Sequence, residues 1–147
     1  MPELLNAANA GDFAAVPADA RLEDWVHGSP LDSAVTALYD LFRVRGIGQA
    51  KRSKLLHLKR PWLVPIYDTR LEDVYKARAT AAGTELGDAA AGWWEATRRD
   101  LIDGAGDFAC LSAALSADND AQVRRVGRLT ALRLLDILAW TLGGNGK

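Results

Sequence analysis

The sequence predicts an all-α protein, a single-domain orthogonal bundle of five or six helices. Three observations indicate this fold: apolar residues recur at helical spacing, capping residues precede those runs, and no segment makes a convincing strand. The chain has 147 residues, which is the size of one domain and enough to bury a core. We therefore expect one domain over residues 1–147.

The composition is that of an ordinary soluble globular protein, with 49% hydrophobic and 25% charged residues. The one cysteine, Cys110, excludes an internal disulfide, and with two histidines no zinc or iron–sulfur ligand set is visible. No apolar run approaches the roughly 18 residues of a membrane span. We expect a cytoplasmic protein with no metal, no cofactor and no membrane contact.

The first part of the chain predicts a helix-hairpin-helix over residues 29–58, preceded by an irregular or short helical segment over residues 1–28. Ser29 is a good N-cap and Pro30 suits the first helical position, so a helix starts there and runs to about Phe42. In the earlier segment, Trp25 is expected to pack against the body of the protein.

A second helix is expected from about Gln49 to Leu58, because Pro61 prevents it from continuing. Its leucines, Leu55, Leu56 and Leu58, are expected to face the core while its lysines point outward.

Residues 59–147 are expected to form the rest of the bundle, beginning with an extended run over 62–67. Thr69 and Glu72 match a capping box and open a helix to about Ala82, which Gly83 stops. Further helices are expected after Asp88, over 107–117, and over 123–142 behind a cap at 118–120.

The positive charge of the chain is concentrated between residues 43 and 60. Seven of its 18 basic residues lie there, and no acidic residue occurs between Leu41 and Tyr67, although the formal net charge is −1. Without these seven, the chain has 11 basic against 19 acidic residues. An anion is the natural partner of this basic island, which consists of Arg43, Arg45, Lys51, Arg52, Lys54, Lys59 and Arg60.

Two glycines at the centre of the island, Gly46 and Gly48, predict a tight turn between the two helices. Ile47 between them is expected to plug into the core. The turn brings backbone N–H groups and the positive end of the second helix to one place, where they suit a phosphate. The sequence thus predicts a hairpin that holds a nucleic-acid backbone without reading bases. Its candidate binding residues are Arg45, Gly46, Ile47, Gly48, Gln49, Lys51, Arg52 and Lys54.

These residues resemble the helix-hairpin-helix base-excision DNA glycosylases, which have a Gly-Ile-Gly hairpin followed by a catalytic aspartate. Asp68, 22 positions beyond Gly46, matches that aspartate, and the resemblance implies that it stabilises the positively charged sugar or orients water. Ala50 stands where bifunctional members carry their Schiff-base lysine, so any activity is expected to be monofunctional.

Most of the chain also looks like a bacterial family of unassigned function. The segments that carry this second resemblance are Lys54 to Pro61, Pro65 to Asp68, Trp93-Trp94, and Leu132 to Trp140.

The sequence favours a DNA-binding protein of the helix-hairpin-helix type that holds the backbone non-specifically, and it leaves DNA versus RNA open. One alternative is a minimal monofunctional DNA glycosylase using Asp68, although that residue is also placed to cap the helix opened by Thr69. Another is a protein-interaction module that forms a homodimer or binds an acidic protein. Whether the protein is an enzyme is left open.

Overall fold

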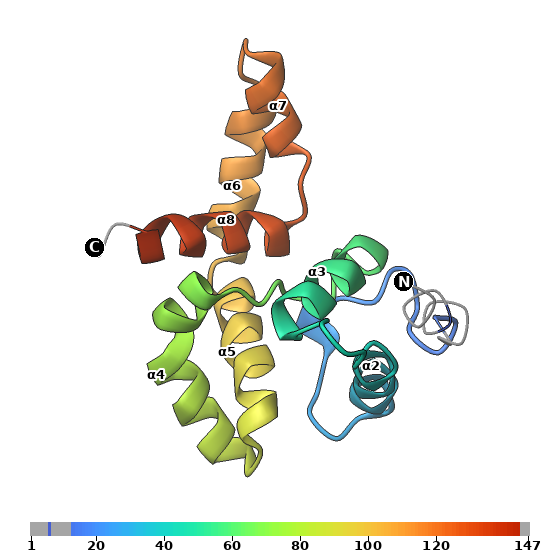
Figure 1. The fold of residues 1–147 in the computed structure, drawn as a ribbon. Coiled ribbons are helices and arrows are strands. Elements are labelled where there is room, and N and C mark those ends of the chain that lie inside the picture. Colours follow the sequence, from blue (N-terminus) through green and yellow to red (C-terminus); the bar gives the residue numbers. More distant parts are fainter. Residues whose placement is uncertain (1–5, 7–12, 145–147) are drawn as a thin grey trace. The chain divides into compact units, whose positions relative to one another are not determined.

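The computed structural model describes residues 6 and 13–144, and over these residues the regular structure is entirely helical (Figure 1). The all-α prediction is confirmed. The helices of the described residues are η1 (Leu22–Asp24), α2 (Pro30–Leu41), α3 (Gln49–Lys59), α4 (Thr69–Leu86), α5 (Ala89–Asp103), α6 (Ala105–Ser116), α7 (Ala121–Gly127) and α8 (Ala131–Gly144).

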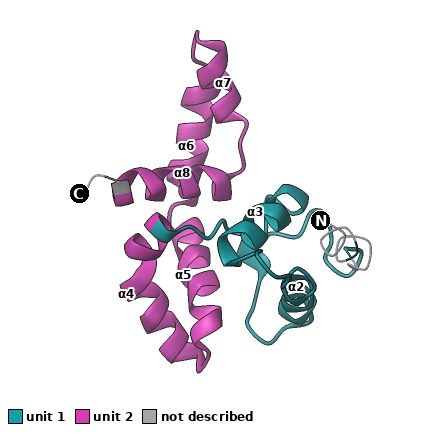
Figure 2. Cartoon of the chain, viewed as in Figure 1, with its two compact units in different colours: residues 1–69 teal, residues 70–147 magenta. Residues whose placement is uncertain are grey.

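The contacts within the chain group it into two compact units, residues 1–69 and residues 70–147 (Figure 2). The first contains η1, α2 and α3, and the second contains nearly all of α4 and the helices that follow. The prediction of one domain over residues 1–147 stays a prediction.

The start of α2 is fixed by side chains on both sides of Ser29. The Ser29 hydroxyl oxygen accepts a hydrogen bond from the Asp32 amide at 3.1 Å, as a capping residue does. The Asp32 carboxylate in turn accepts from Trp25 Nε1 at 3.1 Å and from the Gly28 amide at 2.8 Å. Trp25 is buried, so its predicted packing and the predicted start of this helix are confirmed.

Arg60 attaches the N-terminal segment to the rest of the first unit. Its Nε donates to the Val16 carbonyl at 2.7 Å, its Nη2 donates to the Phe13 carbonyl, and its guanidinium lies over the Phe13 ring. Of the irregular segment predicted over 1–28, residues 1–5 and 7–12 lie outside the described residues.

The buried face of α3 consists of Ser53, Leu56 and His57. Leu58 lies about 200° around the helix from Leu56, and it is 77% exposed. The prediction that Leu58 faces the core is wrong, because a polar pair takes the positions beside Leu56.

In the second unit, α4 and α5 lie side by side and approach closely through two glycines (Figure 1). A Cβ atom on Gly92 would lie 2.1 Å from the Ala79 carbonyl oxygen and 2.7 Å from the Gly83 amide nitrogen. The predicted helix end at Ala82 is wrong, since α4 continues through Gly83 to Leu86. Gly83 permits the contact between the two helices rather than ending the first.

A polar cluster crosses the same pair of helices. The buried Tyr75 hydroxyl donates to Asp100 Oδ2 at 2.8 Å, and Arg78 Nη1 donates to the same oxygen at 2.6 Å. Burial raises the pKa of the Tyr75 phenol, and the hydrogen bond to the Asp100 carboxylate raises it further. The phenol therefore stays protonated and contributes a hydrogen bond to the packing of α4 on α5.

The helix predicted over 123–142 is two helices, α7 and α8. Ser112 Oγ on α6 donates to the Gly127 carbonyl at 2.6 Å, and the Thr130 hydroxyl accepts from the Arg133 amide at 3.0 Å. The first bond holds the end of α7 on α6 in the hairpin of Figure 1, and the second caps the start of α8. The apolar pattern is continuous over 123–142, but the contact of Gly127 with α6 and the cap at Thr130 divide this segment into two helices.

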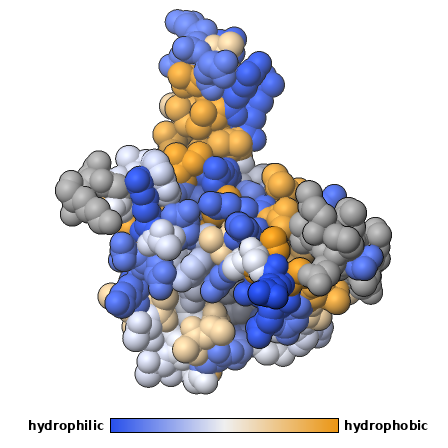
Figure 3. Space-filling model, viewed as in Figure 1, coloured by the Kyte–Doolittle hydropathy of each residue, from blue (hydrophilic) through white to orange (hydrophobic). Residues whose placement is uncertain are grey.

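The second unit also exposes large apolar side chains. On the face shown in Figure 3, apolar residues gather over the hairpin of α6 and α7. The exposed large side chains of α5, α7, α8 and the residues between the last two are Ile102, Val126, Leu129, Leu138, Trp140 and Leu142.

The close approach of α4 and α5 predicts a large cost for any side chain at residue 92. Gly92→Ala should lower the free energy of unfolding by about 2 kcal/mol or more, because the new methyl group meets backbone atoms, which cannot move aside locally. Gly106→Ala is the control, since a Cβ there meets nothing within 4 Å and alanine favours the helix. Urea unfolding of both variants checks this, and equal stabilities would contradict the described packing.

Candidate nucleic-acid interface

The loop that joins α2 to α3 contains a tight turn that requires glycine. The Ile47 amide donates to the Val44 carbonyl at 2.9 Å, which closes a four-residue turn. Gly46 occupies the third position of this turn with φ of 82°, as in a type II β-turn. Residues other than glycine adopt this conformation only with strain, so the turn explains Gly46.

Gly48 has no such backbone requirement. Its φ of −73° and ψ of 174° are ordinary extended values, and it stands at the N-cap of α3. A Cβ on Gly46 or on Gly48 would meet nothing within 4 Å, so open space lies over both. Ile47 between them is partly buried and is not among the fully buried core residues, so its packing into the core stays a prediction.

The first turn of α3 is open to an anion. No side chain of the described residues accepts a hydrogen bond at this cap, and the first turn contains no acidic residue. The Gly48 carbonyl accepts from the Lys51 and Arg52 amides, at 3.1 and 3.0 Å, so those two amides are used within the helix. The amides of Gln49 and Ala50 precede them at the positive end of the helix, where an anion is favoured.

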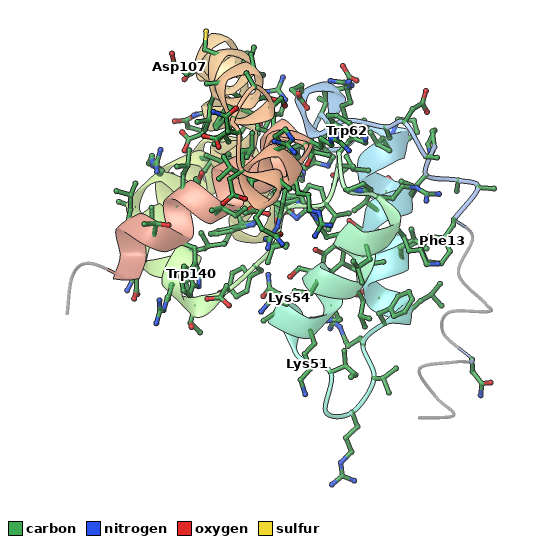
Figure 4. All side chains as sticks on the ribbon, turned by 90° about the horizontal axis from the view of Figure 1, so that it is seen from above. Phe13, Lys51, Lys54, Trp62, Asp107 and Trp140 are labelled. Atoms are coloured by element: carbon green, nitrogen blue, oxygen red, sulfur yellow. The ribbon has the colours of Figure 1, made fainter. Side chains whose placement is uncertain are left out.

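Three cations of the basic island lie on the solvent side of this loop and helix: Arg45, Lys51 and Lys54 are all exposed. Lys51 Nζ donates to the Gly46 carbonyl at 3.2 Å, and Lys54 Nζ lies 3.3 Å from Asp68 Oδ2. Figure 4 shows Lys51 and Lys54 on α3, with Lys51 at the end of the helix that joins the loop. Residues three apart are neighbours on a helix surface, so the two lysines form a short row.

Other members of the basic island are used inside the first unit. Arg52 Nη1 donates to the Tyr39 carbonyl at 3.2 Å, which ties α3 to α2, and Arg43 pairs with Asp40 at 3.1 Å. Arg60 holds the N-terminal segment. The structure thus directs Arg52, a predicted binding residue, toward α2, whereas Arg45, Lys51 and Lys54 are exposed to solvent.

The run predicted as extended over 62–67 begins with a turn at residues 61–63 and continues without regular structure to Asp68. Two buried polar side chains of α3, which the sequence prediction missed as positioning residues, hold this run against the helix. Ser53 Oγ accepts a hydrogen bond from the Tyr67 amide at 2.9 Å and lies 3.3 Å from the Tyr67 carbonyl. One turn later, His57 Nδ1 lies 2.7 Å from the Val64 carbonyl, so Nδ1 carries the proton and donates. Their spacing of four beside Leu56 is the signal that could have revealed them.

Asp68 directly follows this anchored run and directly precedes α4. Its side chain is 24% exposed, and the carboxylate lies beside Lys54 on α3. The structure therefore brings Asp68 to the lysine row. Both predicted roles, catalysis and helix capping, stay predictions.

The described residues contain neither a metal-binding cluster nor a membrane-spanning helix. No group of three His, Cys, Asp or Glu side chains in this part of the chain could hold a metal ion. Nor is any helix within residues 6 and 13–144 long and apolar enough to cross a membrane.

Comparison with known proteins identifies one family. The model of a family of unknown function (DUF6308) matches residues 5–143, nearly the whole chain, and the chain belongs to this family. No curated protein and no solved structure matches it. The predicted resemblance to a family of unassigned function is confirmed, and the resemblance to DNA glycosylases stays a prediction.

The different backbones of the two loop glycines predict different costs of substitution. Gly46→Ala should destabilise the protein by about 1 kcal/mol, because alanine is strained at φ of 82°. Gly48→Ser should leave stability unchanged or slightly raised, because serine suits both an extended backbone and the N-cap. Urea unfolding measures both, and a Gly48→Ser loss as large as that of Gly46→Ala would contradict the described loop.

Proposed function

We propose that this member of the DUF6308 family binds DNA non-specifically, as a helix-hairpin-helix protein holding one phosphate backbone at the start of α3. The observation that carries the proposal is the open space over Gly46 and Gly48 beside an uncapped helix start. Only Gly46 is explained by its backbone. A glycine at 48 is most useful where a ligand approaches the main chain closely.

The chemistry of such a contact is that of a helix N-terminus binding an anion. A phosphate oxygen accepts hydrogen bonds from the Gln49 and Ala50 amides, and the helix dipole favours its charge. Arg45 and Lys51 add positive charge from the loop and from the first turn. Because these groups contact phosphate rather than base edges, the binding is independent of sequence.

The small number of contacts sets the strength of binding. Three or four neutralised phosphates give weak affinity, which should fall roughly 40- to 150-fold when salt rises from about 50 to about 200 mM. A protein of this kind gains useful affinity by binding DNA through more than one copy or alongside another DNA-binding protein.

One observation favours a second candidate function, monofunctional base excision. The Asp68 carboxylate lies 3.3 Å from Lys54, at the end of the row proposed to hold the backbone. This alternative requires an abasic site to form in a damaged duplex, detected by alkaline cleavage, and requires Asp68→Asn to abolish it.

The third candidate, a protein-interaction module, is favoured by the exposed side chains of Leu138, Trp140 and Leu142. It requires the molecular mass of the protein in solution to increase with protein concentration, while an added DNA duplex remains unbound.

Charge reversal in the lysine row tests DNA binding directly. Lys51→Glu combined with Lys54→Glu should weaken binding of a labelled duplex more than about tenfold at low salt, because it places two negative charges at the proposed phosphate site. Fluorescence anisotropy measures the affinity, with single-stranded RNA as a second ligand and circular dichroism as the check on folding.

The matched control is Lys59→Glu combined with Lys76→Glu, which changes the net charge equally at two exposed lysines outside the row. Equal losses in both double variants would show that net charge alone governs binding. Unchanged binding in the Lys51 and Lys54 variant would contradict the proposed site.

A further inference from the structure

We propose that Asp68 regulates the affinity of this site by competing with the DNA phosphate for Lys54, an inference that rests on the proposed function. The two lysines of the row are held by different kinds of acceptor. Lys51 donates a hydrogen bond to the neutral carbonyl of Gly46 in the loop, whereas Lys54 donates to the charged Asp68 carboxylate. A charged acceptor retains an ammonium group more strongly than a neutral one.

The backbone on both sides of Asp68 is held by the fold. Before it, the buried Ser53 hydroxyl accepts from the amide of Tyr67, the residue adjacent to Asp68. After it, α4 begins at Thr69, and the positive end of that helix favours a carboxylate there. Asp68 is therefore a positioned internal anion, with less freedom than an exposed surface carboxylate.

The pair is nevertheless accessible to a competing anion. The Lys54 side chain is 55% exposed, and ion pairs in contact with water are weak. An arriving phosphate can take Lys54 from Asp68, but the carboxylate then remains close to the bound DNA and repels it. Lys51 thus contributes fully to binding, while the contribution of Lys54 is reduced by the presence of Asp68.

Asp68→Asn is a suitable variant to test this inference. Asparagine has the same size and is as good a helix N-cap as aspartate, so the start of α4 is retained. Asp19→Asn is the matched control, because it removes the same charge from an exposed residue of the same unit. Lys54→Ala and Lys51→Ala are then made in the wild type and in Asp68→Asn.

Binding of a labelled duplex is measured by anisotropy at several salt concentrations. Asp68→Asn should bind the duplex about three- to tenfold more tightly than the wild type, and its steeper salt dependence should correspond to one additional counterion released from the DNA. Asp19→Asn should change the affinity less than about twofold. Lys54→Ala should weaken binding less than about twofold in the wild type and more than about threefold in Asp68→Asn. Lys51→Ala should weaken both backgrounds to a similar degree.

The outcomes separate this inference from the proposed function. If the wild type binds the duplex and Asp68→Asn binds no more tightly than Asp19→Asn, competition by Asp68 is wrong while DNA binding stands. Weaker binding in Asp68→Asn, with the fold intact, would also overturn the inference. If neither protein binds at low salt, the proposed function itself is wrong.

Discussion

The candidate site depends on the hydrogen bonds that Ser53 makes at the end of the segment between α3 and α4. This hydroxyl is buried on α3 and bonds to the backbone of Tyr67, 14 positions further along the chain. His57 repeats the contact one turn later, on Val64. Ser53 pairs a backbone amide and His57 pairs a backbone carbonyl, so these two side chains fix the position of the segment against the helix. Because they do, Asp68 lies beside Lys54.

The basic island is one feature of the sequence but has two uses in the structure. Arg52 and Arg60 donate to backbone carbonyls within the first unit and stabilise its fold. Arg45, Lys51 and Lys54 lie outward around the loop and the start of α3. Arginine suits the internal role, because its planar guanidinium donates in several directions at once. The concentration of charge in the sequence thus overstates the number of groups available to a ligand.

The features that the sequence predicted correctly are set by neighbouring residues. Ser29, Asp88 and Asp120 each accept a hydrogen bond from an amide of the helix they precede, as their positions indicated. The errors concern contacts between distant segments. Leu58 is exposed because Ser53 and His57 occupy the buried face, and Gly83 lies within a helix because α5 packs there. The sequence pattern is the same whether a leucine is buried or exposed, and whether a glycine ends a helix or lies within it. The segment that packs against the residue determines which of the two occurs.

In the candidate site, too, the features set by neighbouring residues could be predicted and the contacts between distant segments could not. The turn at Gly46 and the cations of α3 could be predicted, because a short stretch of chain contains them. The pairing of Asp68 with Lys54 could not, since it is a contact between segments that lie 14 positions apart in the chain. Two acceptors for two neighbouring lysines, one neutral and one charged, are visible only when the chain is folded.

The most direct test of the account follows the backbone amides of the labelled protein by NMR while a DNA duplex is added. Binding at the start of α3 predicts that the largest shifts belong to residues 45–51, led by the Gln49 and Ala50 amides, and that high salt reverses them. Shifts confined to α6, α7 and α8, with residues 45–51 unchanged, would contradict the account and place the binding surface on the second unit.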